Sequence, residues 1–199
     1  MKSAGLSTRK NLVCLLFISL VMLFSCSKDV LNDENPDLKK AKVPIPMKME
    51  VCMDPAAELN FPVENTPVLN PATGAVIIPK LYMAAESWLS GYGTHMGELI
   101  KEQSYMTAKS ASLDLNALFT EQKVILKATY DAIMTGANGD HITMVSHISI
   151  DVTDLSHRTI TGDWTITGGS GNFEYAEGEG LLNGLIPCWT LEGTLIYPR

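Results

Sequence analysis

The second half of the chain alternates apolar and polar side chains with a period of two residues. Apolar residues share one face of four segments: 124–132, 142–150, 160–166 and 189–197. A period of two is typical of β-strands that bury one face. The segments are separated by 136–140, which contains the tight hairpin signal Asn138-Gly139, and by the glycine-rich stretch 168–171. This pattern predicts antiparallel strands joined by short turns.

The first half carries the same pattern less regularly. Residues 47–53 alternate methionine and valine with lysine, glutamate and cysteine, which predicts a strand. A long proline-rich loop is expected over 55–79, and 111–119 fits either a helical turn or a strand. Other strand candidates are 75–78, 81–88 and 95–104. No segment has a convincing helical period, so the chain is expected to be all-β, either an antiparallel barrel or a sandwich.

The N-terminus has a basic start, an apolar run over 12–24 and then Ser25-Cys26, which is the build of a secretory signal. The ending resembles the lipobox of bacterial lipoproteins, in which the cysteine is acylated and becomes the mature N-terminus. A plain signal peptide is the alternative. We therefore expect a lipoprotein signal peptide over 1–25, a disordered tether over 26–43 and one β domain over 44–199.

Acidic residues close behind Cys26 resemble the surface-export signals of Bacteroidetes-type lipoproteins, although a solvated spacer would also contain them. The expected location is the cell envelope, lipid-anchored at the outer membrane and facing the periplasm or the cell surface. The formal net charge of −7 and pI near 5.0 argue against a nucleic-acid partner and against attraction to anionic lipid. The membrane is therefore expected to hold the protein through its N-terminal lipid.

Three motifs follow in order: GTHMG at 93–97, ANGD at 137–140 and TGGSGNFEYAEGEG at 167–180. The last resembles the G-G-T-G-R-F-x-x-A-x-G pattern of the allene-oxide-cyclase and dirigent-like β-barrels, with Ser170 and Asn172 departing from it. The order of all three is similar to that of small secreted bacterial proteins assigned to that barrel. The resemblance implies an antiparallel β-barrel of about eight strands, allene-oxide-cyclase-like or lipocalin-like. No active-site residue of that family is matched to a position in this sequence.

The chain shows no motif that assigns a catalytic residue, a cofactor or a metal site. His141 and His147 share one strand face, which is expected to point outward. Glu86 and Glu98 have uncertain strand parity, and an apolar lumen would raise the pKa of either carboxyl group and make it a candidate acid. The side chains expected to line a lumen or a ligand cavity are Met49, Glu86, Glu98, Tyr130, Met144, Trp164 and Trp189. They either fill the core or surround a ligand.

Cys52 and Cys188 are the two cysteines that remain if the signal is removed and Cys26 carries lipid. In an up-and-down barrel the first and last strands meet antiparallel, and alternation places both cysteines on the outward face. They are therefore predicted to form a disulfide, with two reduced thiols as the alternative.

The expected function is non-enzymatic binding of a small apolar ligand or of a surface partner. The alternatives are a cyclase- or isomerase-like enzyme that uses the lumen, and a structural cell-surface protein. Neither the ligand nor the oligomeric state follows from the sequence.

Overall fold

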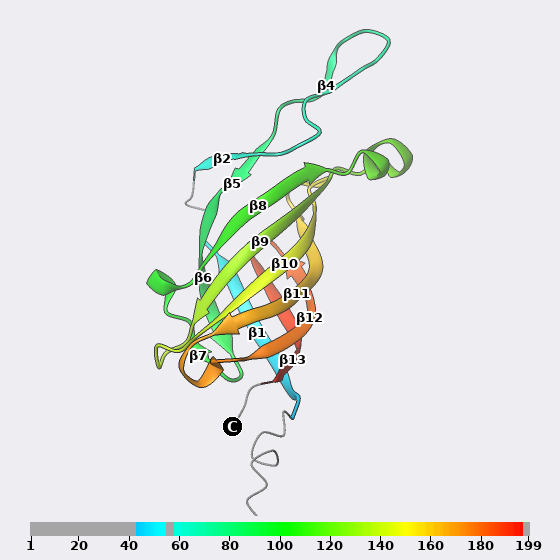
Figure 1. Cartoon of the computed structure of the whole chain (residues 1–199). Helices are drawn as coiled ribbons and strands as arrows, with labels where there is room; N and C mark the ends of the chain where they lie inside the picture. The colour runs from blue at the N-terminus through cyan, green and yellow to red at the C-terminus, as the bar shows by residue number, and fades with distance from the viewer. Residues whose placement is uncertain (1–42, 55–57, 197–199) are drawn as a thin grey trace, which may run out of the picture. The chain divides into compact units, whose positions relative to one another are not determined.

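The structure, a computed structural model, describes residues 43–54 and 58–196 (Figure 1). Its main feature is a nine-stranded sheet in which eight antiparallel strands close into a ring, since β6 pairs with β1 as well as with β8. The prediction of an all-β antiparallel fold is confirmed. The expected signal peptide and the expected tether over 26–43, apart from residue 43, lie outside the described residues, and Cys26 is among them.

The strands of the ring are β1 (Ile45–Met53), β6 (Glu86–Gly93), β8 (Tyr105–Leu113), β9 (Ile125–Thr135), β10 (His141–Asp151), β11 (Thr159–Gly169), β12 (Glu177–Leu185) and β13 (Cys188–Ile196). The remaining strands are β2 (Leu59–Pro62), β3 (Val68–Leu69), β4 (Val76–Ile78), β5 (Tyr82–Ala84) and β7 (Gly97–Glu98). The helices are the short elements η2 (Lys101–Gln103), η3 (Ala117–Glu121) and η4 (Gly171–Phe173). None of the helices that the structure describes has the length and apolar character needed to cross a membrane.

Alternation along each strand of the ring separates an apolar interior from a polar outer wall. In β10, Ile142, Met144 and Ile148 are buried while His147 between them is exposed. Burial of these apolar side chains is the main stabilising contribution, and a closed ring leaves few unpaired edge groups. Because the closed sheet has one inward and one outward face, every second residue of a strand is apolar, and this explains the alternation in the sequence.

The two ends of the ring differ. Ile45 pairs with Leu195, so the described chain begins and ends at one end of the ring, here called the terminal end. At the opposite end, the arm end, β1 connects to β6 through residues 54–85. Within that connection β2 pairs with β5, and β3 pairs with β4. We call residues 58–85 the arm, and Figure 1 shows it projecting beyond the ring.

Several expectations for the first half need correction. The expected loop over 55–79 carries two further short strands besides β4, which confirms the strand expected over 75–78, because its prolines limit strand length without preventing local pairing. The expected strand over 81–88 is two strands, β5 in the arm and β6 in the ring. Most of 95–104 is a turn, β7 and η2, because Gly97 adopts a positive φ of 71° that reverses the chain. The ambiguous segment 111–119 ends β8 and then enters η3.

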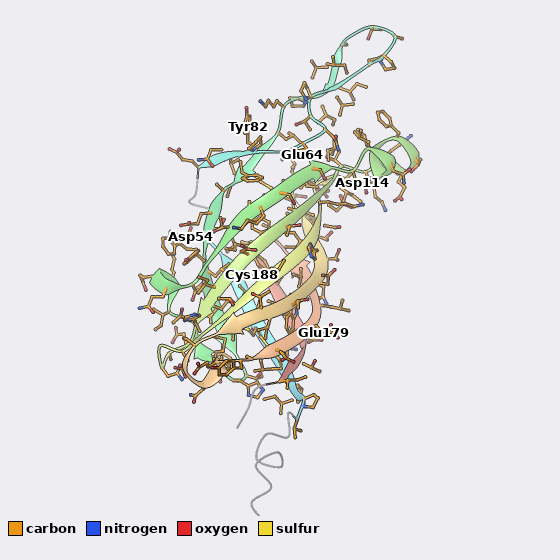
Figure 2. The ribbon with its side chains drawn as sticks, viewed as in Figure 1. Asp54, Glu64, Tyr82, Asp114, Glu179 and Cys188 are labelled. Atoms are coloured by element: carbon orange, nitrogen blue, oxygen red, sulfur yellow. A yellow bond between two sulfur atoms is a disulfide. The ribbon has the colours of Figure 1, made fainter. Side chains whose placement is uncertain are left out.

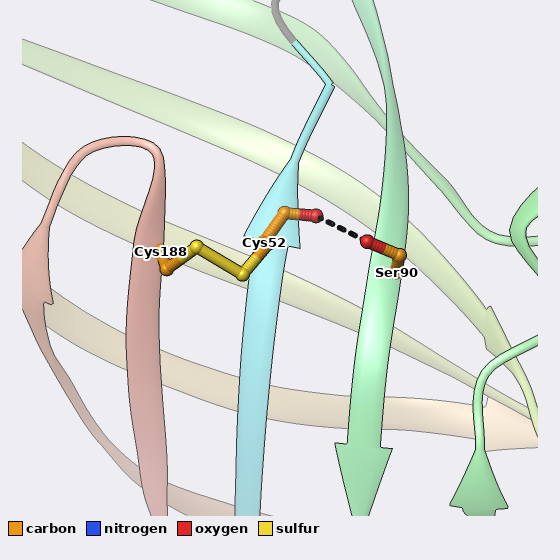
Figure 3. The surroundings of a disulfide bond; sticks show 3 residues. All are labelled: Cys52, Ser90 and Cys188. Atoms are coloured by element: carbon orange, nitrogen blue, oxygen red, sulfur yellow. Dashed lines mark hydrogen bonds between the residues drawn. A yellow bond between two sulfur atoms is a disulfide. The ribbon is translucent and has the colours of Figure 1, made fainter.

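A disulfide joins the strands on either side of one seam of the ring (Figure 3). Cys52 in β1 lies directly opposite Cys188 in β13, and their sulfur atoms are 2.11 Å apart. On the other side of β1, the hydroxyl group of Ser90 in β6 donates to the carbonyl oxygen of Cys52 at 3.5 Å. The crosslink spans 136 residues of sequence, so it holds the first strand of the ring to the last.

Replacement of both cysteines, in Cys52→Ala/Cys188→Ala, is expected to lower the free energy of unfolding by about 4–5 kcal/mol, because a crosslink over so long a loop restricts the unfolded chain. Urea unfolding followed by circular dichroism measures this. Mapping under non-reducing conditions is the companion test. Recovery of both thiols free and alkylatable in the folded, oxidised protein would contradict the crosslink.

Candidate functional site

At one point of the interior, the indole of a buried tryptophan packs over two glycines of the neighbouring strands. Trp164 of β11 is directly opposite Gly180 of β12, which in turn faces Gly193 of β13. A Cβ atom added at Gly180 or Gly193 would lie 2.5 or 2.7 Å from Cζ2 of Trp164. The indole N–H of Trp164 donates to the carbonyl oxygen of Leu181 at 3.1 Å. The two glycines therefore provide the space that the indole occupies.

Five of the residues expected to line a lumen are buried in the interior. They are Met49, Tyr130, Met144, Trp164 and Trp189. The hydroxyl group of Tyr130 donates to the sulfur atom of Met83 at 3.7 Å, which is a weak interaction. Burial raises the pKa of Tyr130 to about 12 because it disfavours the phenolate.

Glu86 and Glu98 do not belong to the interior. In β6, Ser87 and Leu89 point inward, so alternation places Glu86 on the outer wall. Glu98 pairs with Tyr92, another outward residue of β6. Both carboxyl groups are exposed, so neither has the apolar surroundings that would make it an interior acid.

The interior cavities lined by residues that the structure describes are small. One interior cavity, lined by residues that include Met134, Leu182 and Trp189, has a volume of about 20 Å³. That volume accommodates roughly one water molecule. A second interior site, between Met49 and Phe173, has no room for a water-sized sphere. Pockets for small organic ligands commonly enclose about 300–1,000 Å³.

The outer wall carries a larger hollow across β8, β9, β10 and β11, with a volume of about 370 Å³. We call it the groove. Two rows of outward side chains cross it, each with one residue from every strand. The rows are Ser112–Lys127–Ser149–Thr161 and Ser110–Thr129–His147–Asp163. Apart from Lys127, the side chains of the two rows are short or of moderate size, so the wall is hollow here.

The lysine of the groove already forms an ion pair. Lys127 donates to Asp114 at 2.7 Å, and that hydrogen bond together with the backbone N–H of Ala117 lowers the pKa of Asp114. His147 and Thr129 are hydrogen-bonded through Nδ1 and Oγ1 at 3.1 Å, and Asp163 faces His147 across the strand pair. The groove therefore presents hydroxyl groups, an imidazole and a carboxylate, with its lysine already engaged.

The other histidines make local contacts. His141 shares a hydrogen bond with Ser170 at 2.8 Å, and His95 contacts the carbonyl oxygen of Pro46 at 2.8 Å. His157 lies 3.6 Å from Asp154 in the connection between β10 and β11. Within 43–54 and 58–196, no three His, Cys, Asp or Glu side chains are grouped closely enough to hold a metal ion.

No family model matches this chain, and comparisons with curated proteins and with solved structures also find no match. The groove is therefore described from its geometry alone. Sequence alternation places Lys127, Thr129 and His147 on polar faces, but only the strand register brings them beside Ser110 and Asp163. A regular run of hydroxyl residues on neighbouring strands is the signal that could have indicated the groove.

Substitution Gly193→Ala is expected to destabilise the protein by about 1–3 kcal/mol, because the added methyl group would clash with the carbonyl oxygen of Glu179 and the Cα atom of Gly180 as well as with the indole of Trp164. The matched control is Gly168→Ala in β11, where a Cβ atom would meet only the hydroxyl oxygen of Thr143, at 3.3 Å. Thermal unfolding of the two variants makes the comparison. Equal stability of Gly193→Ala and the unchanged protein would show that the interior is not tightly filled.

Proposed function

We propose that this protein is an exported, lipid-anchored binding protein without enzymatic activity, which engages its partner on the outer wall of the ring. We also infer that the ring is a filled β-barrel of the allene-oxide-cyclase-like kind. The closed order of eight strands and the glycine-rich segment between β11 and β12 support this inference.

One observation carries the proposal, namely the filled interior. A cavity of about 20 Å³ cannot admit a small apolar ligand or an apolar substrate. The cyclase-like alternative also loses its candidate acids, because Glu86 and Glu98 lie outside. Of the two partners expected from the sequence, a surface partner is therefore the one that the geometry supports.

The groove supports a neutral ligand rich in hydroxyl groups, such as a segment of carbohydrate. Serine and threonine hydroxyls both donate and accept hydrogen bonds, as sugar hydroxyls do. Pairing of Lys127 with Asp114 leaves no strong attraction for an anion. The Thr129–His147 pair lies on an open wall that does not exclude water, which favours binding over acyl-transfer chemistry.

Filling the groove is expected to weaken binding of a neutral polysaccharide by about tenfold or more. In Thr161→Tyr the phenol ring occupies the groove, and Thr165→Tyr makes the same change on an exposed outward position of the same strand beyond the groove. Electrophoresis through gels containing dextran, xylan or starch should retard the unchanged protein and Thr165→Tyr. Thr161→Tyr should bind about tenfold more weakly or less. Equal mobility of all three proteins in every gel would contradict the proposal.

Cys26 is proposed to hold the protein at the membrane through its acyl chains. The basic start, the apolar run and the Ser25-Cys26 ending support this. A Cys26→Ala protein is expected to leave the washed membrane fraction, and the unchanged protein to carry the mass of a lipid. If the variant stays bound while the unchanged protein shows no lipid mass, the anchor is wrong.

A further inference from the structure

Exposed apolar side chains gather at the arm end of the ring. Of fourteen large hydrophobic residues that are exposed in the described part of the chain, five lie on the arm and four lie on or beside the other three connections at this end. Leu115 and Phe119, for example, flank the start of η3. The described chain enters and leaves at the opposite end, which has few such residues. The asymmetry separates the terminal end from an apolar arm end.

The β3–β4 hairpin forms the outermost part of the arm (Figure 1) and has an apolar, uncharged tip. Leu69, Val76 and Ile77 are 51%, 60% and 47% exposed. No charged residue occurs over 65–79, in a chain with a formal net charge of −7. A hairpin without charges avoids the large cost of carrying an ion out of water.

The backbone N–H groups of the tip are hydrogen-bonded within the turn itself. The N–H groups of Ala72 and Thr73 donate to the side-chain oxygen of Asn70 at 2.9 and 3.3 Å. The N–H group of Asn70 donates to Ala75, that of Gly74 to Asn70, and that of Ala75 to the hydroxyl oxygen of Thr73. Pro71 has no N–H group. Every backbone donor from 70 to 75 is therefore paired within the turn, which lowers the cost of moving these N–H groups out of water.

The arm is fixed to the ring at its base. The N–H group of Glu64 donates to Ala111 at 2.8 Å, and the carbonyl oxygen of Glu64 accepts from Leu113 at 3.0 Å. Val63 and Val68 belong to the buried core. Figure 2 shows Glu64 where the arm joins the ring and Tyr82 further out on the arm. The hairpin is thus held in a fixed projection from the ring.

We propose that the β3–β4 hairpin inserts its tip into the interface of a lipid bilayer. Leu69, Val76 and Ile77 supply the apolar contact, and the paired backbone keeps the cost of leaving water low. Three aliphatic side chains give a reversible contact that is weaker than acylation, so the arm alone does not retain the Cys26→Ala protein through washing. The inference concerns a surface separate from the groove and does not depend on its ligand.

A bilayer fits these features better than a protein surface does. The apolar side chains come from four separate connections, and a fluid acyl layer accommodates such an arrangement more readily than a rigid partner does. Protein interfaces favour Trp, Tyr, Arg and Met at their centres, whereas the tip offers Leu, Val and Ile. Pro67 before β3 and Pro79 after β4 limit addition of a further strand from a second copy.

A tryptophan at the tip tests insertion directly. The protein lacking residues 1–26, and so lacking both the apolar run over 12–24 and the acylation site, is mixed with vesicles of neutral phosphatidylcholine whose acyl chains are brominated, since bromine quenches indole emission only at close range. The emission added by Ile77→Trp is expected to be quenched. The control is Leu181→Trp, on the outer wall of β12 where Leu181 is 66% exposed, and its added emission is expected to remain. Equal quenching of both variants, or of neither, would overturn the proposal.

A second comparison measures affinity. The Leu69→Ser/Ile77→Ser variant is expected to partition into the vesicles about tenfold more weakly than the unchanged arm, while Leu181→Ser matches it. Thermal unfolding checks that each variant is folded. Failure of the unchanged arm to bind vesicles would overturn the proposal. If sedimentation also showed dimers that are lost in the Leu69→Ser/Ile77→Ser variant, the tip would be assigned to contact with a second copy. Neither result affects polysaccharide binding at the groove, which is measured separately.

Discussion

Packing of Trp164 against Gly180 and Gly193 is the contact on which the rest of the structure depends. The glycines of β12 and β13 open a space on the interior wall, and the indole of β11 occupies it. An eight-stranded ring encloses an interior that side chains can nearly fill, and here methionine, isoleucine and tryptophan do so. Dense packing stabilises the ring and at the same time removes the cavity that a lumenal ligand would need.

A filled interior moves recognition to the outside of the molecule. The wall over β8 to β11 combines hydroxyl groups with one imidazole and one carboxylate, while the arm end combines aliphatic side chains with an uncharged hairpin. These surfaces differ in chemistry and come from different parts of the chain. The proposed binding at the groove and the proposed insertion of the arm therefore use separate surfaces of one ring.

The sequence indicates much of the ring because alternation in a half-buried strand has a direct physical cause. It places Ile142, Met144 and Trp164 inside and His147 outside. Alternation also places Cys52 and Cys188 on one face, although their contact depends on a register that only the folded sheet fixes. The parity of Glu86 and Glu98 was uncertain because glycines interrupt the pattern around them. The short strands of the arm are too brief to give a period, and the groove needs the register of four strands at once.

The central claim is that the interior of the ring is closed to ligands. Native mass spectrometry of the protein taken from its own host tests it most directly. The account predicts the mass of the polypeptide with its crosslink and any N-terminal lipid, and no further small molecule. A stoichiometric apolar compound that is retained in the gas phase, and is released only when the protein unfolds, would contradict it.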